Sequence, residues 1–474
     1  MKNKFKLLAA GILGSTGLYF GTRYLMNNLT NWIGKILMTD EYGENLIELY
    51  TASKRIGIQN IAELNLRAES GQVIKRPLGS PRTAISLDGL KFNAAQVYQL
   101  PTELNQPIDC QTIIGKNSNQ PLILKTPIIL SGMAYGFAVT EQAKYAMAKA
   151  SSLAGTATNT GIGPLLPKER QLADRLIIQY QRGAWNKEPE ILKQADMIEI
   201  QFGQGAILGL GIMTSPSEID DTLRKRLGLA PEEPAIVPSR FSETKYDNGL
   251  PKLVAYLKEI SDGVPIGCKI AITNDIEKDL EILLNANVDV IALDGSQGGS
   301  IGSPPLLQDD FGLPTLIGLV RAIDYLEKTG RRNQVDLIVG GGLFSPSHFL
   351  KVLALGADAI YIGTASLLAM SHTQVLKPVP FEPPTQLVWQ NAKYAHRFDW
   401  KKGAQSLANY IKSCTDEMKD GVRTLGKTSI HQVNKNDLIC LDRITSEITG
   451  IPLAYQEKLS SNLTRRRQLA RRTP

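Results

Sequence analysis

A glycine-rich segment between Asp294 and Pro304, with the sequence DGSQGGSIGSP, directly follows the apolar run VDVIAL at 288–293. Glycine has no Cβ, so a strand that ends in such a loop allows a planar or phosphorylated ligand to approach the backbone closely. The same composition also suits a plain turn. The segment therefore predicts a ligand site at the end of a strand, with a purely structural loop as the alternative.

Two further glycine clusters follow apolar runs later in the chain. Gly340, Gly341 and Gly342 come after the run at 337–339, and Gly363 comes after the run at 359–362. In a (β/α)8 barrel, the backbone N–H groups after the last two strands and a helix N-terminus form a phosphate site. The pair of clusters predicts such a cradle. Helix caps and ordinary turns are the alternative interpretation.

Polar residues also stand where other strands are expected to end. Lys269 lies in the apolar run 266–272 and needs a partner if it is buried. That partner is either a cofactor carbonyl or ring nitrogen, or an inward carboxylate such as Asp294. The four histidines lie away from strand ends, so a histidine base is not expected. The other polar strand-end positions are Ser131 to Gly136, Asn159 to Gly161, Gln201, Gln204 and Gly205.

From residue 121 onward, short apolar runs alternate with amphipathic helical patterns, which is typical of a parallel sheet with crossover helices. Strands are expected at 128–130, 156–158, 197–200, 266–270, 288–293, 337–339 and 359–362, with a weakly marked eighth near 315–319. This arrangement predicts an α/β fold, a (β/α)8 TIM barrel whose ligand site lies at the carboxyl ends of the strands. A doubly wound open sheet is the alternative, but no G-x-G-x-x-G turn follows the first strand.

The rest of the chain divides around this barrel. We expect an apolar N-terminal segment at 1–29, a covering segment at 30–120, the barrel at 121–376 and a helical C-terminal extension at 377–474. The stretch 212–248, between the expected third and fourth strands, is rich in proline and charge and is expected at the rim of the site.

Composition is ordinary for a folded protein, with 43% hydrophobic and 21% charged residues among 474. The net charge of +7 owes much to the tail TRRRQLARRTP, so a nucleic-acid partner is not expected. That tail is either a solvated end or a contact for anionic lipid. The four cysteines are far apart in sequence, which predicts buried free thiols in a reducing compartment and no metal site.

The N-terminal segment suggests membrane attachment. After Lys2, Lys4 and Lys6, residues 7–22 carry no charge, and Phe5 and residues 24–26 extend the apolar stretch. No small-residue cleavage site follows, so a retained anchor through residues 5–26 is expected rather than a signal peptide. A docked apolar helix or an interfacial helix is the alternative. The expected location is a membrane with a single N-terminal anchor and the barrel on the cytoplasmic side.

Taken together, these segments resemble the flavin-binding barrel of the glutamate synthases over residues 125–370, and more sparsely over 83–442. LKTPIILSGMAYG resembles the first-strand segment of that family, TATNTGIG the second and ADMIEIQFGQGA the third. IGCKIA resembles the lysine-bearing fourth strand and LDGSQGGSIGSP the loop after the fifth. IVGGGLFSPSHFLKVLALGADAIYIGTASL resembles the phosphate-binding seventh and eighth units.

The resemblance implies FMN as the cofactor, with its ring system over Ser131, Gly132, Met133 and Ala134 and with Lys269 near the ring edge. It implies that the phosphate lies on Gly341, Gly342, Gly363 and Thr364. The remaining cofactor contacts that we expect are Asn159, Gln201, Asp294, Gly295, Gly298 and Gly299. Lys269 and Gln204 are the expected catalytic residues.

The sequence also departs from that family on the substrate side. Ile162 and Leu165 stand where the resemblance implies glutamates, and Ile207 replaces a lysine that helps to hold 2-oxoglutarate. Ser296 and Gln297 replace a histidine–aspartate pair. Losing a cationic carboxylate clamp removes charge-assisted hydrogen bonds, for which Arg240 is a candidate substitute.

Two further parts of the large family enzymes are not expected. The chain opens with an apolar segment instead of a glutaminase domain, and the family's iron–sulfur cysteines have no counterpart in LLAMSHTQVLKPVP. We therefore expect neither glutamine hydrolysis nor an iron–sulfur cluster.

The sequence as a whole predicts a membrane-anchored FMN oxidoreductase acting on a small molecule, with hydride transfer between the flavin and an imine or amino acid. Glutamate formation from 2-oxoglutarate and ammonia is the nearest family activity. The alternatives are a flavin dehydrogenase or an isomerase on a phosphate-bearing ligand, and a non-catalytic flavin-binding membrane protein. The sequence does not identify the electron donor.

Overall fold

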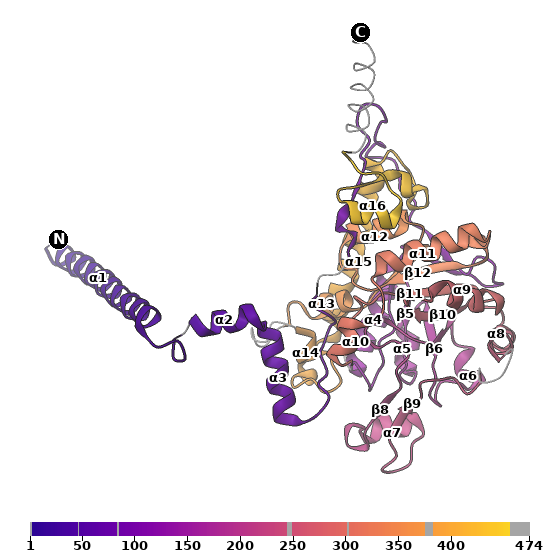
Figure 1. Cartoon of the computed structure of the whole chain (residues 1–474), viewed down its shortest axis with the longest axis horizontal. Coiled ribbons are helices and arrows are strands. Elements are labelled where there is room, and N and C mark those ends of the chain that lie inside the picture. The colour runs from indigo at the N-terminus through magenta and orange to yellow at the C-terminus, as the bar shows by residue number, and fades with distance from the viewer. Residues whose placement is uncertain are drawn as a thin grey trace, which may run out of the picture. The chain divides into compact units, whose positions relative to one another are not determined.

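The structure, a computed structural model, describes residues 2–45, 47–82, 85–243, 249–300, 303–374 and 383–455, with no side-chain description for 2–16 and 383. The chain divides into two compact units, Met1–Ile74 and Lys75–Pro474 (Figure 1). The basic tail lies outside the described residues, as does most of the expected extended link at 377–384.

The first unit contains three helices, α1 (Lys2–Thr39), α2 (Ile47–Arg55) and α3 (Ile58–Ser70). Several apolar side chains of α1 are exposed, among them Leu18, Leu25, Leu29 and Trp32. Across the described residues, no helix combines the length and apolar character that crossing a membrane requires. Side chains 5–16 of the predicted anchor lie outside the description.

The second unit is built on a barrel of eight parallel strands surrounded by helices (Figure 1). The ladder of paired strands runs from β4 through β13, β12, β11, β10, β7 and β6 to β5. A hydrogen bond of 3.0 Å from the Leu130 N–H to the Ala157 carbonyl links the two ends of this order. The predicted (β/α)8 barrel is confirmed. Its strands are β4 (Ile128–Leu130), β5 (Thr158–Asn159), β6 (Leu176–Tyr180), β7 (Met197–Gln201), β10 (Ile266–Ala271), β11 (Val290–Asp294), β12 (Asp336–Gly340) and β13 (Ala359–Ile362).

One predicted strand is wrong, and one real strand was not predicted. Residues 315–319 begin helix α11 (Thr315–Lys328), whose buried residues include Leu316, Leu319 and Ile323 at helical spacing. The missing strand is β6, a run of five buried residues. Lys269 therefore lies on the fifth barrel strand instead of the fourth, and the glycine-rich segment follows the sixth.

Helices cover the outside of the barrel. The C-terminal amphipathic helix that the sequence predicts is α15, which packs against α4, α12 and α13. A hydrogen bond of 2.8 Å between the Thr126 and Thr415 hydroxyls fixes α15 to the start of the first barrel strand. The covering helices are α4 (Glu141–Ala154), α5 (Pro167–Leu172), α6 (Pro189–Leu192), α8 (Gly249–Ile260), α9 (Ile276–Asn285), α11, α12 (Pro346–Ala354), α13 (Thr364–Ser371) and α15 (Trp400–Thr424).

The barrel interior is filled by apolar side chains, so it is a packed core rather than a pore. Met197, Val290 and Ile338 pack there with Ile114 and Leu122 of the hairpin formed by β2 (Thr112–Ile114) and β3 (Leu122–Leu124). A second cluster joins the outer faces of the strands to the helices. The barrel strands are therefore buried on both sides, as their nearly continuous apolar runs predict.

Smaller elements complete the unit. The region after β7 forms a hairpin of β8 (Ile212–Thr214) and β9 (Ala235–Val237) with η3 (Pro216–Glu218) and α7 (Asp221–Leu227) between them (Figure 1). β1 (Leu90–Phe92) pairs antiparallel with β14 (Leu438–Cys440). The remaining helices are η1 (Leu87–Gly89), η2 (Gly205–Ile207), α10 (Pro305–Asp310), η4 (Arg332–Gln334), α14 (Pro383–Leu387), η5 (Ala395–Arg397), η6 (Ile430–Gln432), η7 (Lys435–Asp437) and α16 (Arg443–Thr449).

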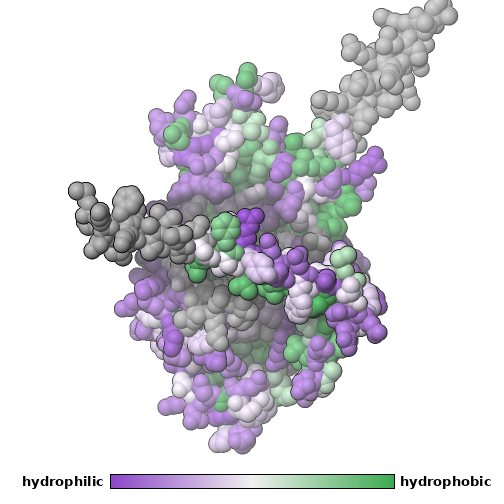
Figure 2. Space-filling view, turned by 90° about the vertical axis from the view of Figure 1, so that its left-hand side faces the viewer, coloured by the Kyte–Doolittle hydropathy of each residue, from purple (hydrophilic) through white to green (hydrophobic). Residues whose placement is uncertain are grey.

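The surface polarity and the state of the cysteine thiols are as expected from the amino-acid composition. On the face drawn in Figure 2, hydrophilic side chains predominate and hydrophobic ones gather in smaller patches. All four cysteines are free and buried. Burial raises the pKa of the Cys110 and Cys414 thiols to about 11, so both thiols stay protonated at neutral pH.

Candidate active site

A cavity of about 520 Å³ opens at the carboxyl ends of the barrel strands, where ligand sites of this fold lie. Its lining includes residues from β10 and from the loops that follow β4, β5, β6, β7, β11 and β13. Most of the predicted site residues lie on it. They are Ser131, Gly132, Met133, Ala134, Gln201, Gln204, Lys269, Asp294, Gly299, Gly363 and Thr364.

The other predicted residues lie next to this lining rather than on it. Asn159 is fully buried, where its Oδ1 accepts a hydrogen bond of 2.9 Å from the Gly161 N–H and so shapes the loop after β5. Gly295 and Gly341 allow two backbones to meet, because a Cβ on either would lie within 3 Å of Thr315. Gly298 and Gly342 are similarly crowded by Asp294 and Gln297. Because these glycines have no side chain, the loops after β11 and β12 can pack closely against their neighbours.

Lys269 is the charged centre of the cavity. Its side chain is only 2% exposed, and its Nζ lies 3.2 Å from the Asp294 carboxylate and donates a 3.2 Å hydrogen bond to the Ser131 hydroxyl. The Tyr361 ring lies beneath it, with Nζ 5.2 Å from the ring centroid, within the range of a cation–π contact. Lys269 therefore has the carboxylate partner that the sequence offered as one alternative, and it also lines the cavity.

Below Lys269 lies a buried polar network that the sequence analysis missed. The Glu199 carboxylate accepts hydrogen bonds of 2.8 Å from Asn159, 2.8 Å from Gln179 and 2.7 Å from the Tyr361 hydroxyl. Burial and the neighbouring Glu199 raise the pKa of Tyr361 well above its usual value, so the hydroxyl remains a donor. A glutamate inside the apolar strand MIEIQ is the signal that could have revealed this network, as the lysine inside IGCKIA revealed Lys269.

The start of α13 provides a candidate anion site. Gly363 is the N-cap residue and gives no side-chain hydrogen bond to the first turn. A Cβ added at Gly363 would meet no atom within 4 Å, so space is open beside these N–H groups. Gly363 and Thr364 both line the cavity. Unpaired N–H groups and the helix dipole together favour a phosphate at such a position.

One polar atom in the cavity still needs a partner. Gln201 is 2% exposed, and among the described residues its Oε1 finds no hydrogen-bond donor. A buried acceptor left unpaired costs about 1–3 kcal/mol. A bound ligand with an N–H group would satisfy it.

A second buried cation lines the cavity, and it was not predicted. Arg182 is 4% exposed, and its guanidinium donates to the backbone carbonyls of Gly209 at 2.6 Å, Ser239 at 3.1 Å and Leu210 at 3.3 Å. In the described part of the chain, its hydrogen bonds go to backbone carbonyls and not to a carboxylate, and its Nε has no acceptor. Burial lowers the pKa of Arg182, but arginine stays charged at neutral pH.

Only some of the residues that replace the family's expected substrate contacts line the cavity. Ile162 and Ile207 line the cavity, whereas Leu165 does not. Gln297 is occupied structurally, since its Nε2 donates to the Ile85 carbonyl at 3.2 Å and its Oε1 accepts from the Thr315 N–H at 2.8 Å. Arg240, the candidate substitute cation, is exposed and is not among the lining residues. Of these two arginines, Arg182 lines the cavity and Arg240 does not.

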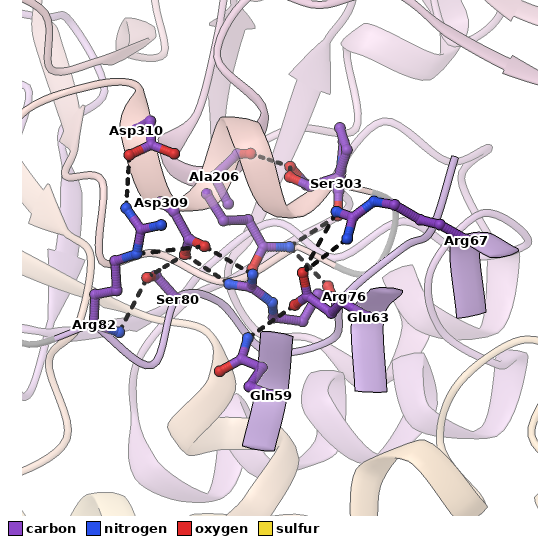
Figure 3. Close-up of polar contacts among 12 residues, drawn as sticks. Gln59, Glu63, Arg67, Arg76, Ser80, Arg82, Ala206, Ser303, Asp309 and Asp310 are labelled. Atoms are coloured by element: carbon purple, nitrogen blue, oxygen red, sulfur yellow. Dashed lines mark hydrogen bonds and ion pairs between the residues drawn. The ribbon is translucent and has the colours of Figure 1, made fainter. Parts of the chain in front are cut away.

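One wall of the cavity is fixed by a strap, which we define as residues 75–82. Arg76 forms an ion pair of 2.6 Å with Asp309, to which Ser80 also donates a hydrogen bond of 2.5 Å (Figure 3). Arg82 pairs with Asp310 at 2.6 Å. Lys75 and Leu78 of the strap line the cavity. These ion pairs therefore fix the strap to α10 within the second unit.

The strap also presses on the glycine-rich loop. A Cβ on Gly299 would lie 2.8 Å from the Leu78 carbonyl and 2.9 Å from the Thr364 hydroxyl, so only glycine fits there without a shift. The Ser303 hydroxyl then joins the end of this loop to the Ala206 carbonyl (Figure 3). Loop, strap and η2 form one continuous wall.

Fold and cavity place the chain in the class of (β/α)8 barrel proteins with a ligand site at the carboxyl face. Residues 83–428 match the family described as the conserved region in glutamate synthase. The chain belongs to this family, as its motifs predict. The oxidoreductase class expected from those motifs is likewise confirmed, and the substrate stays open.

Individual relatives agree with this assignment. A glutamate synthase large subunit-like protein of Rhizobium meliloti is 29% identical over 413 residues, 83% of this chain and 93% of that protein. An archaeal glutamate synthase [NADPH] of Archaeoglobus fulgidus is 28% identical over 401 residues, 80% of this chain and 78% of that protein. Among solved structures, the flavin-binding domain of baker's yeast flavocytochrome b2 aligns with a TM-score of 0.46 and 14% identity over 74% of this chain and 76% of that one.

Proposed function

We propose that the protein is an FMN-dependent oxidoreductase that interconverts a 2-oxo acid, with ammonia, and the corresponding amino acid. The observation that carries the proposal is that one cavity unites a candidate cofactor site around Lys269 with a buried unpaired cation, Arg182. In the synthetic direction, ammonia and the 2-oxo acid lose water to form an imino acid. Two electrons and two protons then add across its C=N bond.

The residues present fit FMN. Gln201 offers a buried, unpaired acceptor, and the first turn of α13 begins without a side-chain cap beside open space at Gly363. A flavin carries both a ring N–H and a phosphate, so it would satisfy both features. When bound, FMN supplies reversible two-electron chemistry that no side chain provides.

This chain's own residues would position and tune the reacting groups. Lys269, held by Asp294 and Ser131, places a positive charge at a fixed point of the cavity. A fixed charge in a buried site stabilises negative charge that develops beside it. Gln204 lines the same cavity, next to Gln201, and is the second candidate for contact with the reacting atoms.

Arg182 would bind the carboxylate of the acid. Its guanidinium is held by three carbonyls, so it is preorganised, and it still has an unused Nε donor. Hydrogen bonds between arginine and a carboxylate are charge-assisted and directional. Glutamate formation from 2-oxoglutarate is one reaction of this class.

The visible spectrum of the purified full-length protein tests the cofactor. We expect a yellow protein that releases FMN on denaturation, identified by mass spectrometry. A colourless protein that does not take up added FMN, but binds a phosphorylated metabolite, would instead support the isomerase alternative. The electron donor is a separate question, and NADPH is the first candidate to test because relatives carry it in their names.

We also propose that α1 attaches the protein to a membrane surface, with the barrel on the cytoplasmic side. Exposed Leu25, Leu29 and Trp32 on α1 support this proposal, since leucine and tryptophan favour the membrane interface. Flotation with anionic vesicles tests it. Changing Leu25 and Leu29 to aspartate should abolish flotation, whereas aspartate at Asn27 and Asn31 should reduce it much less. Equal flotation of both double variants would contradict the proposal.

A further inference from the structure

Apolar side chains line much of the cavity that contains Arg182, beside polar ones such as Gln179, Gln204 and Asn391. Phe137 and Ile162 come from the loops after β4 and β5, and Ile207 comes from η2. Trp389 follows α14, and Met213 lies on the rim hairpin β8–β9. Four regions of the sequence, with Ile207 and Met213 in the same one, therefore bring aliphatic and aromatic side chains to one cavity.

This apolar wall is held in place by its neighbours. The Phe137 ring stacks on Trp185, with centroids 5.4 Å apart and planes 12° from parallel. The Trp185 indole N–H donates a 2.6 Å hydrogen bond to the Ile162 carbonyl, and the Asn186 amide donates a 2.7 Å bond to the Gly163 carbonyl. Ile207 is 4% exposed. The wall is thus preformed, as in most small-molecule sites.

The charges of the cavity are equally specific. Lys269 is compensated by Asp294, and Glu218 is engaged in a capping interaction with Ser215. Lys75 of the strap is exposed to solvent. Within the described lining, Arg182 is therefore the buried cation that lacks a carboxylate partner.

We propose that the acid bound at Arg182 is a monocarboxylate with an aliphatic or aromatic side chain, in its 2-oxo or 2-amino form, rather than a dicarboxylate. This inference rests on the proposed function and narrows its substrate. One carboxylate matches the one unpaired buried cation, and an apolar side chain matches the wall. A second carboxylate against Ile162 and Ile207 would lose its hydration without a partner, which is costly.

Binding to the FMN-loaded full chain tests the inference by calorimetry, independently of turnover. The probes are 3-methyl-2-oxobutanoate, phenylpyruvate and 2-oxoglutarate. We expect at least one of the two apolar acids to bind tenfold or more tightly than 2-oxoglutarate, since a few methylene groups in an apolar pocket give about 10- to 200-fold each.

The variant Ile207→Lys should invert this preference by adding a second cation to the wall. Ile236→Lys is the matched control, because Ile236 is exposed on β9 and lies outside the cavity lining. It should leave all three affinities unchanged. Lys75→Ala measures what the exposed cation contributes, and we expect a change below threefold.

Tighter binding of 2-oxoglutarate than of both apolar acids would overturn the inference, as would an Ile207→Lys variant with unchanged preference. A more than tenfold loss of 2-oxoglutarate binding in Lys75→Ala would also overturn it. These outcomes leave the proposed function intact. A chain that holds no FMN, or that binds no acid at all, would instead contradict the proposed function itself.

Discussion

The two halves of the cavity differ in how their charges are satisfied. Around Lys269, the charged groups have partners within the protein, from Asp294 and Ser131 down to Glu199 and Tyr361, whereas the Gln201 Oε1 has no donor among the described residues. Around Arg182, the guanidinium is held by backbone carbonyls, and apolar side chains such as Ile162 and Ile207 line the same cavity. The first half is built for a resident group. The second half leaves one charge to be completed by a ligand.

The two halves of the cavity also differ in how closely their residues resemble the glutamate synthases. The motifs shared with the glutamate synthases fall mainly on the half around Lys269, whereas the departures Ile162 and Ile207 line the other half. A barrel can keep its cofactor site and change its substrate by altering loop residues.

The largest effect is expected from a substitution that removes the positive charge of Lys269 from its half of the cavity. Lys269→Met leaves Asp294 without its cation, and losing one member of a buried ion pair costs about 3–5 kcal/mol. We expect lower stability in chemical denaturation and loss of bound flavin. Lys278→Met is the control, because its pair with Asp275 is exposed and should change little. Retention of flavin at wild-type affinity in Lys269→Met would exclude Lys269 from the cofactor site.

The next largest effect is expected in the half of the cavity around Arg182. Arg182→Gln removes the charge but retains hydrogen-bonding capacity, and should weaken 2-oxo acid binding about 10- to 150-fold, since charged hydrogen bonds contribute about 1.5–3 kcal/mol. Flavin content should stay unchanged. Arg240 is exposed and follows the rim hairpin β8–β9 in sequence. The variant Arg240→Gln should therefore alter neither acid binding nor flavin content. Acid binding that survives Arg182→Gln would place the carboxylate elsewhere.

A smaller effect is expected below Lys269. Tyr361→Phe removes one of the hydrogen bonds to Glu199 and should reduce the free energy of unfolding by about 1–2 kcal/mol. Tyr325→Phe removes an equally short hydrogen bond to Glu281 on the surface and serves as the control. If the two variants lose the same free energy of unfolding in urea, the buried hydrogen bond to Glu199 stabilises the fold no more than a surface hydrogen bond does.

The smallest effect concerns the strap. The hydrogen bond from Arg76 lowers the pKa of Asp309, so the folded state favours the ionised carboxylate. This stabilisation is complete above the unfolded pKa of about 4 and is lost as pH falls through the lower folded value. Asp309→Asn should therefore cost about 1 kcal/mol at pH 7 and less as the pH drops below 4. Asp310→Asn, beside the more exposed Arg82, is the matched control and should cost less stability than Asp309→Asn at pH 7.

Much of this organisation follows from sequence pattern. Apolar runs ending in glycine or polar residues located seven of the eight barrel strands, and a lysine inside an apolar strand revealed the centre of the site. The sequence analysis did not predict a strand for the run LIIQY, and it also missed Arg182, which lies two residues after that run. The weakly marked strand expected at 315–319 is instead the start of α11, because the apolar residues of TLIGLVRAIDYLEK repeat at helical spacing.

Other features depend on tertiary structure and have no local signal. Whether Arg182 or Arg240 reaches the cavity is decided by which loop folds over the strand ends, not by residue type. The strap contacts join residues 76–82 to 309–310, more than 220 positions away. Gly295 and Gly341 were expected at the ligand, but they serve loop packing, a distinction that depends on what lies opposite each Cα.

Anaerobic reoxidation of the reduced protein tests the central claim most directly. The full-length protein is photoreduced until the flavin band disappears, and a 2-oxo acid with ammonia is then added. The account predicts that the flavin band returns, that one amino acid forms per flavin, and that Arg182→Gln slows the return. A flavin that stays reduced with 2-oxoglutarate, 3-methyl-2-oxobutanoate and phenylpyruvate alike would contradict it.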